Sequence, residues 1–116
     1  MLRLEAAMAK KNSPRGALEG PARYTKEACA RRLLLLRLAV ANLEGRKITQ
    51  TEFAERAGLK QSGYTHYENG LRLPSIDAAA ALADTYDLSL DWLYLGQEFN
   101  MPFEIMQEIK RVDAAN

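Results

Sequence analysis

Four polar side chains between residues 61 and 66 carry hydrogen-bonding groups that can read the edges of nucleic-acid bases. A glutamine amide holds a donor and an acceptor side by side, which matches N6 and N7 of adenine, and hydroxyl or imidazole groups can contact a base or a phosphate. If a helix runs from about residue 61 to residue 69, these side chains lie opposite Tyr64 and Tyr67. We therefore predict base contacts for Gln61, Ser62, Thr65 and His66.

Groups that could hold phosphates surround this face. The free N–H groups at the start of a helix, here near Gln50 and Thr51, bind anions. Nearby cations are expected to lie against the nucleic-acid backbone: Arg46, Lys47, Lys60 and Arg72. Residues 46–95 carry five basic and seven acidic side chains, a net charge of −2, so binding would depend on this local arrangement and not on bulk charge.

The composition argues against other chemistries. With one cysteine and one histidine among 116 residues, neither an internal disulfide nor a zinc cluster can form. No Ser-His-Asp or Cys-His arrangement and no glycine-rich phosphate loop is present, so we expect no enzyme and no cofactor. Cys29 is interpreted as a packing residue. His66 has no partner residue for a metal, and a pH-sensing role for it stays open.

The elements that position these groups are two short helices joined by a tight turn, within residues 49–70. Thr49 and Glu52 have the spacing of a capping box, and Ile48 and Phe53 that of a hydrophobic staple. Gly58 follows the first helix where a left-handed residue is needed. Two helices joined in this way form a helix-turn-helix. Its predicted core is Phe53, Ala54, Gly58, Leu59, Tyr64 and Tyr67.

A long helix is expected before this unit, from an N-cap at Thr25 to about Leu43. Its core stripe is predicted to be Leu33, Leu36, Val40 and Leu43. Leu34, Leu35 and Leu38 lie off that stripe. They indicate a second buried face, which either the C-terminal segment or a partner subunit could cover.

Two further helices are expected after it. Ser75 caps one that ends near Tyr86, with an inward side of Ile76, Ala79, Ala80 and Ala83. Ser89 caps a short one that ends at Gly96, with Leu88 and Leu93 as a staple. Trp92 is interpreted as a core anchor.

The tail 97–116 holds a last short helix that begins near Pro102. Its apolar strip is predicted to be Phe103, Met106 and Ile109, with Ile105 and Val112 as further candidates. So short a helix must dock on something, either this chain or a second copy. The candidate dimer contacts are Leu90, Tyr94, Phe103, Met106 and Ile109.

Charge divides the chain into an arm and a body. Residues 1–26 carry six basic and two acidic side chains, net +4, and the remainder ten and thirteen, net −3. Residues 1–23 show no sustained apolar period, so disorder is expected there, either as a solvated tail or as an arm that contacts DNA. Translation could start at Met1 or Met8. No secretory signal or membrane span is legible, which suits a cytoplasmic protein.

The sequence resembles the Cro and lambda-repressor type of helix-turn-helix, also called XRE-like. The likeness covers residues 30–96 and rests on ITQTEFAERAGL, YENG, the RLPS loop and LSLDWL, in that order. It implies an all-α fold: a compact five-helix DNA-binding domain at 24–96, with a short C-terminal helix and a disordered N-terminal arm.

The resemblance also implies roles for single residues. Gln61 would bond an adenine edge while Gln50 braces it and touches a phosphate. Ser62 would meet a guanine or a phosphate, and Asn69 a phosphate. Tyr64 departs from the Ile or Val that is usual at its position, and Lys60 from the usual helix cap.

These observations favour a sequence-specific DNA-binding transcriptional regulator, a repressor that binds a pseudo-palindromic double-stranded operator as a homodimer. The alternative is a protein-binding module on the same fold, such as an antiactivator or an antitoxin subunit. The acidic body, the additional leucines before residue 40 and the apolar tail motivate that alternative.

Overall fold

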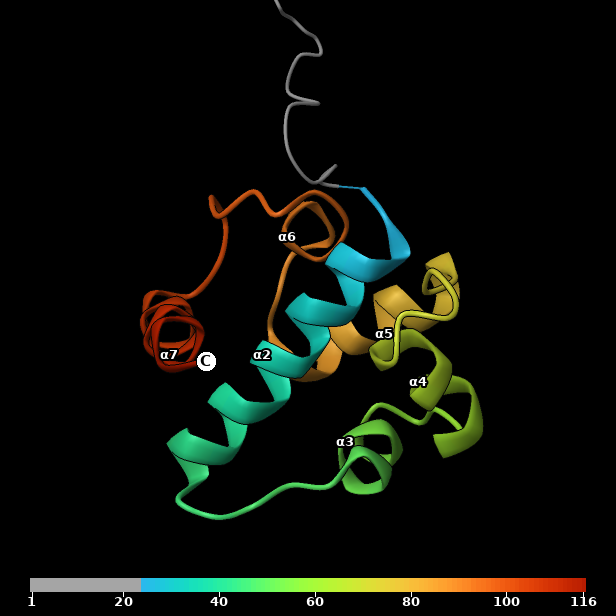
Figure 1. Ribbon diagram of the computed structural model, residues 1–116, viewed down its shortest axis with the longest axis horizontal. Coiled ribbons are helices and arrows are strands. Elements are labelled where there is room, and N and C mark those ends of the chain that lie inside the picture. Colours follow the sequence, from blue (N-terminus) through green and yellow to red (C-terminus); the bar gives the residue numbers. More distant parts are fainter. Residues whose placement is uncertain (1–23) are drawn as a thin grey trace, which may run out of the picture.

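The computed structural model describes residues 24–116, which contain six α-helices joined by turns and loops (Figure 1). They are α2 (Lys26–Glu44), α3 (Gln50–Arg56), α4 (Gln61–Glu68), α5 (Ile76–Tyr86), α6 (Leu90–Leu95) and α7 (Phe103–Ala115). No strand occurs in this part. The predicted all-α class, with five helices and a further C-terminal one, is therefore confirmed. The predicted arm, residues 1–23, lies outside the described residues.

Hydroxyl side chains determine where four of these helices begin. Thr25, Thr49, Ser75 and Ser89 each accept a hydrogen bond from the backbone N–H three residues later, at 3.0–3.1 Å. Each bond satisfies a donor that the helix itself leaves free. All four caps agree with the prediction, because capping depends on residues that are close in sequence.

The turn between α3 and α4 forms as expected. Gly58 adopts a φ of 73°, a left-handed conformation that costs glycine little. The N–H of Leu59 then bonds the carbonyl of Ala54 at 2.9 Å, which closes the end of α3. Ile48 and Phe53 are both buried, in agreement with the staple. The chain is thereby turned so that α4 begins three residues after the glycine.

Helix α2 crosses the middle of the molecule and is buried on more than one side (Figure 1). Leu33 and Leu36 are fully buried, and so, nearly, is Leu35 on the neighbouring face. The predicted stripe is wrong at Leu43, which is exposed near the end of α2. Of the predicted second face, Leu35 is buried and Leu38 packs partly buried against the same core, whereas Leu34 is only partly buried and does not belong to it. The C-terminal segment contacts α2 through α7.

Helix α7 docks on α2 within the same chain. Ile105, Met106, Ile109 and Val112 are buried in one core with Leu35. Met106 and Ile109 are thus not available as dimer contacts, and the prediction is corrected for both. The predicted apolar strip is wrong at Phe103, which is 76% exposed and does not lie in the buried side of α7.

Helix α5 turns part of the expected side inward, since Ala79 is fully buried and Ala83 packs against the core. The prediction is wrong at Ile76, which is 66% exposed, and Leu82 is fully buried instead. Tyr86 lies farther along the same side, stacks on Phe53 with ring centroids 4.1 Å apart, and donates a hydrogen bond of 2.6 Å to its carbonyl oxygen. This contact ties the end of α5 to the middle of α3, and so holds the helix-turn-helix from behind.

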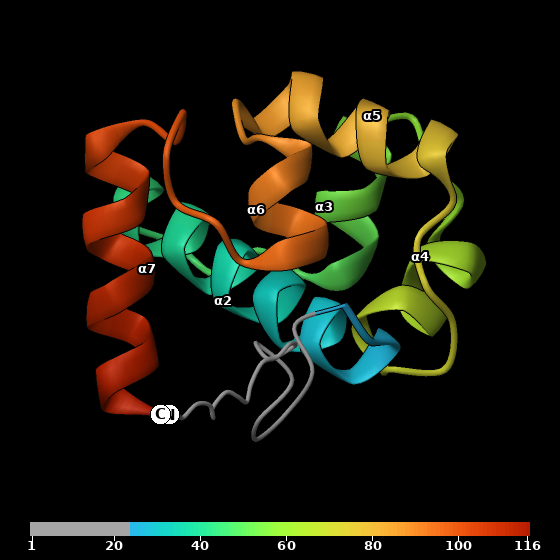
Figure 2. The ribbon, with the colours of Figure 1, turned by 90° about the horizontal axis from the view of Figure 1, so that it is seen from above.

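The two views of the ribbon place α4 and α7 at opposite ends of the molecule (Figures 1 and 2). Helix α2 lies between them and contacts both. The predicted base-contacting residues and the C-terminal helix are therefore separated by the core.

Candidate nucleic-acid interface

Helix α4 presents its polar residues to solvent because Tyr64 anchors its other side. Tyr64 is fully buried, with its ring 5.5 Å from that of Phe53. Tyr67, the second residue predicted to face inward, is partly buried against the same core. The core therefore accommodates the ring of Tyr64, at a position where the family that the sequence resembles usually has Ile or Val.

Three of the four predicted base-contacting residues lie exposed on this helix: Gln61, Ser62 and His66. Thr65 is only partly exposed, and it joins two of the predicted residues to each other. The Gln61 amide donates to the Thr65 hydroxyl at 2.7 Å, and that hydroxyl donates to Oε1 of Gln50 at 3.2 Å. Gln50 at the start of α3 is thus connected to Gln61 through Thr65 instead of directly.

A buried ion pair lies behind this surface and was missed in the sequence. Arg37 of α2 donates to Oε1 and Oε2 of Glu68 at 3.0 and 2.6 Å and to the carbonyl of Ile48 at 2.9 Å. The Tyr64 hydroxyl donates to Glu68 at 2.8 Å. A signal was present, because Arg37 is the one charged residue between Leu33 and Val40 and a lone arginine in an apolar run needs a buried partner.

The electrostatics of the pair keep both groups charged. Burial raises the pKa of Glu68, but hydrogen bonds from Arg37, Gln50 and Tyr64 outweigh it and the pKa lies below its usual value. The hydrogen bond to Glu68 raises the pKa of Arg37. Burial raises the pKa of Tyr64 strongly, so its hydroxyl stays a donor. The carboxylate of Glu68 is therefore a fixed negative acceptor at neutral pH.

The residues predicted to contact the nucleic-acid backbone differ in their surroundings. Lys47, Thr51, Lys60, Asn69 and Arg72 are all exposed. The Lys60 side chain makes no capping hydrogen bond at the start of α4.

Arg46 is held in a cluster on the protein itself. Its guanidinium binds the carboxylate of Glu52 and lies 3.6 Å from that of Glu44, and Arg56 joins the same two acids. The hydrogen bonds from Arg46 and then Arg56 lower the pKa of Glu52 to about 2. The carboxylate of Glu52 thus binds Arg46 and Arg56. Of the predicted capping box, the bond from the Glu52 N–H to the Thr49 hydroxyl is present.

Among the described residues, no three His, Cys, Asp or Glu side chains are placed to hold a metal ion. No described helix is both long and apolar enough to cross a membrane. Cys29 is fully buried, and desolvation raises the pKa of its thiol, in agreement with a packing role.

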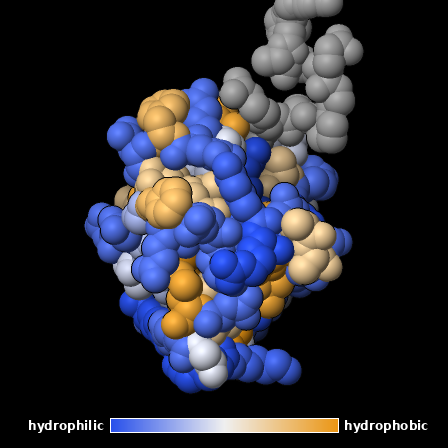
Figure 3. Space-filling view, turned by 90° about the vertical axis from the view of Figure 1, so that its left-hand side faces the viewer, coloured by the Kyte–Doolittle hydropathy of each residue, from blue (hydrophilic) through white to orange (hydrophobic). Residues whose placement is uncertain are grey.

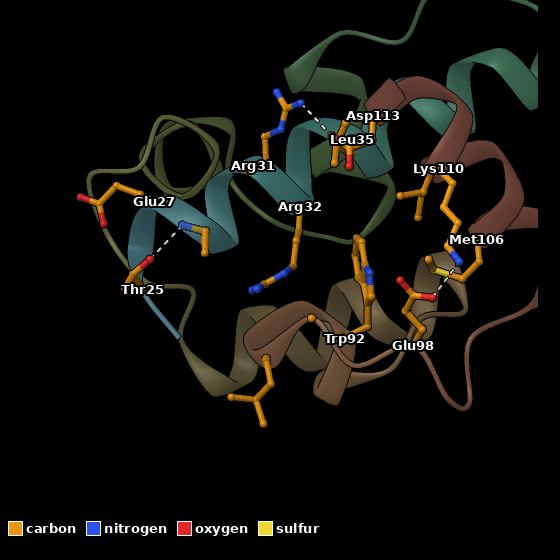
Figure 4. A pocket seen from close by; sticks show the side chains of 14 residues that line it. Thr25, Glu27, Arg31, Arg32, Leu35, Trp92, Glu98, Met106, Lys110 and Asp113 are labelled. Carbon is orange, nitrogen blue, oxygen red and sulfur yellow. Dashed lines mark hydrogen bonds and ion pairs between the residues drawn. The ribbon is translucent and has the colours of Figure 1, made fainter. Parts of the chain in front are cut away.

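A cavity of about 560 Å³ lies between α2, α6 and α7 (Figure 4). Trp92 and Met106 form part of its apolar wall. Arg31 pairs with Asp113 at 2.9 Å and Lys110 with Glu98 at 3.0 Å across its rim. These ion pairs join α7 to α2 and to the loop before α7, so the charged rim serves the docking of this helix.

Comparison with known proteins finds similar sequences for the part of the chain around α3 and α4. Residues 41–93 match the family described as Helix-turn-helix. Two relatives from Bacillus subtilis strain 168 are named as HTH-type transcriptional regulators. The uncharacterized HTH-type transcriptional regulator YqaE is 33% identical over 67 residues, 58% of this chain and 56% of the relative. The HTH-type transcriptional regulator AnsR is 47% identical over 45 residues, 39% of this chain and 38% of the relative.

The matched part of this chain spans about half the length of YqaE and less of AnsR. No solved structure matches the chain significantly. The matched family segment begins near the end of α2 and closes in α6, so it contains the whole of α3, α4 and α5.

Proposed function

We propose that this chain is a sequence-specific DNA-binding transcriptional regulator, because residues 41–93 match the family described as Helix-turn-helix. The observation that carries the proposal is the exposed face of α4. Gln61, Ser62 and His66 project from a helix whose opposite side is fixed by buried Tyr64. The names of both relatives support a regulatory role.

In this proposal α4 enters the major groove of double-stranded DNA. Residues at the start of such a helix contact base edges, so Gln61 pairs with an adenine and Ser62 with a guanine or a phosphate. Lys60, Asn69 and Arg72 lie on or just beyond the same helix and contact phosphates. Bound in this way across a promoter, the protein represses transcription by excluding other proteins. A cytoplasmic location is part of the same proposal.

The regulator binds as a homodimer. Two copies of α4 would then enter successive major grooves about 34–36 Å apart, on a pseudo-palindromic operator. With Met106 and Ile109 buried, the candidate dimer contacts are Leu90, Tyr94 and Phe103. Leu90 and Phe103 are exposed, and Tyr94 is partly so. Sedimentation should show a dimer at high micromolar concentration, and a monomer there contradicts this part of the proposal.

Selection from a random double-stranded DNA pool tests the proposal. The wild-type chain is compared with Gln61→Ala/Ser62→Ala, which changes two exposed side chains and leaves Tyr64 in place. We expect the wild type to enrich an inverted repeat that the variant fails to enrich. Equal enrichment would mean that other residues read the bases, and no enrichment by the wild type, even at low salt, would contradict DNA binding.

A second candidate is a protein-binding module, favoured by exposed aromatic side chains outside the α4 face. Phe99 and Phe103 are both more than half exposed. The α7 side of the molecule shows separate apolar patches within a hydrophilic surface (Figure 3). This candidate gains support if a protein partner binds stably while Gln61→Ala/Ser62→Ala leaves DNA binding unchanged.

A further inference from the structure

A groove between helix α7 and the loop that follows α2 gathers positively charged side chains. It has a volume of about 840 Å³, and four cationic residues line it: Arg37, Arg46, Lys47 and Arg111. Among the described residues that line it, Glu108 is the only acidic one. Lys47 and Arg111 are far apart in sequence, and the docking of α7 on α2 brings them to the same groove.

Two of these four cations are already bound to carboxylates of the protein. Arg37 binds Glu68 behind α4, and Arg46 binds Glu52. Lys47 is exposed, and within the described part of the chain it pairs with no carboxylate. Its ammonium group is therefore available to an anion from outside.

Arg111 also keeps most of its donors for a ligand. Its side chain is 72% exposed, and Nη1 donates to Oε1 of Glu108 at 2.7 Å. A guanidinium has five N–H groups, so this bond leaves the others free. Oε2 of Glu108 accepts from the amide of Asn42 at 3.0 Å, which fixes the carboxylate against α2. Because the side chain of Glu108 is only 7% exposed, the groove presents its cations to solvent more than this acid.

The groove adjoins the segment that is predicted to lie along DNA. Thr49 also lines it, and Gln50 and Thr51, two of the predicted backbone-contacting residues, follow directly in the chain. The loop that carries Lys47 leaves the end of α2 beside α7 and runs to α3 (Figures 1 and 2). Helix α4 lies at the opposite end of the molecule from α7. A DNA strand that passes α3 would therefore reach the groove only beyond the bases that α4 contacts.

We propose that Lys47 and Arg111 bind a phosphate of the DNA backbone, outside the base pairs that α4 contacts. The charge and the oxygen acceptors of a phosphate match both an ammonium and a guanidinium group. The matched family segment ends at residue 93, so Arg111 adds this contact from a helix outside that segment. The proposal rests on the proposed DNA-binding function and names a further pair of residues that carries it.

Arg111→Gln tests the contact, with Lys110→Gln as its matched control. Both changes remove one positive charge from neighbouring positions of α7, but Lys110 pairs with Glu98 and does not line the groove. The substituted amide at position 111 can still donate to Glu108. The duplex selected by the wild type is titrated at several salt concentrations. We expect Arg111→Gln to reduce the slope of log K against log salt by about 0.9 for each bound chain, and Lys110→Gln to leave it near the wild-type value.

Single uncharged phosphates locate the contact on the DNA. The wild type and Arg111→Gln are titrated with duplexes in which one phosphate at a time is replaced by a methylphosphonate. We expect one position, outside the bases whose preference Gln61→Ala/Ser62→Ala loses, where the wild type loses affinity and Arg111→Gln loses none. Arg111→Lys keeps the charge and should keep both the slope and the sensitivity at that position. Urea unfolding of each variant confirms that folded proteins are compared.

The outcomes separate this inference from the function on which it rests. The phosphate contact is overturned, while DNA binding stands, if Arg111→Gln and Lys110→Gln change the slope equally or if Arg111→Lys behaves like Arg111→Gln. It is also overturned if no uncharged phosphate removes the difference between the wild type and Arg111→Gln. A wild-type chain that enriches no DNA overturns the proposed function, and the inference with it.

Discussion

Arg37 and Glu68, 31 residues apart in the chain, are joined by two hydrogen bonds of 3.0 and 2.6 Å. Their side chains are 16% and 4% exposed, so the pair joins the middle of α2 to the last turn of α4 within the core. A buried pair of this kind is costly to break and less costly to replace, because removing one partner leaves an uncompensated charge.

We expect Glu68→Ala to lower the free energy of unfolding by about 3–5 kcal/mol, since Arg37 would then be buried alone. The apolar replacement Arg37→Met/Tyr64→Phe/Glu68→Met should recover most of that loss, because it removes every polar member of the group together. Urea unfolding followed by circular dichroism measures both. A triple variant no more stable than Glu68→Ala would show that the pair itself is a large net source of stability.

The same pair predicts a loss of stability in acid. Because hydrogen bonds hold the folded-state pKa of Glu68 below its unfolded value of about 4.5, the folded state binds a proton less readily than the unfolded chain. The contribution is therefore complete above about pH 4.5 and is lost as the pH falls. The gap in urea midpoint between wild type and Glu68→Gln should narrow from pH 7 to pH 3, and a constant gap would contradict this.

The salt dependence of DNA binding distinguishes lysines that contact a phosphate from lysines that do not. Lys60→Ala should reduce the slope of log K against log salt by about 0.9, because one counterion fewer is released. Lys110→Ala is the matched control, since it removes the same charge from α7, where Lys110 pairs with Glu98. Titrations at four salt concentrations suffice. Equal effects of the two changes would mean that overall charge, and not a contact at α4, governs binding.

The docking of α7 predicts opposite behaviour for two residues of that helix. Ile109→Ala should lower the free energy of unfolding by about 2–5 kcal/mol, because it opens a cavity in the shared core. Phe103→Ala should change it by less than about 0.5 kcal/mol, as an exposed side chain does. Urea unfolding checks both at a concentration where each variant is monomeric. A large effect of Phe103→Ala there would mean that its ring packs on the chain.

Gly63 lies inside α4 with open space where a Cβ would be. Gly63→Ala should therefore stabilise the folded chain by about 0.5–1 kcal/mol, because alanine loses less backbone entropy in a helix. If DNA approaches this helix closely, the same change should weaken binding to the selected duplex. Unfolding and binding are measured on one preparation. Unchanged binding would place the DNA farther from Gly63 than the proposal requires.

Features decided by neighbours in the sequence could be predicted from it. The caps at Thr25, Thr49, Ser75 and Ser89 depend on groups three residues away, and the turn at Gly58 on one backbone conformation. Exposure of Gln61 and Ser62 followed from helical spacing once Tyr64 was assigned to the core. Each of these needs only the geometry of one helix or turn.

Features decided by packing between distant segments could not. The buried side of α5 follows from Tyr86 reaching Phe53, and Ile76, at its first residue, falls outside that contact. An apolar strip in the tail indicated docking but not its partner, which is α2 of the same chain. The bond from Thr65 to Gln50 joins two helices. Periodicity within either helix carries no information about it.

The separation between the buried Arg37–Glu68 pair and the exposed residues of α4 has a consequence for how such a protein changes over generations. A mutation at Arg37 or Glu68 alone destabilises the fold, because it leaves the other charge unpaired. The two positions should therefore co-vary in evolution. Ser62 and His66 carry no such constraint, and each can change singly. New target sequences can therefore arise by single mutations while the scaffold behind them stays the same.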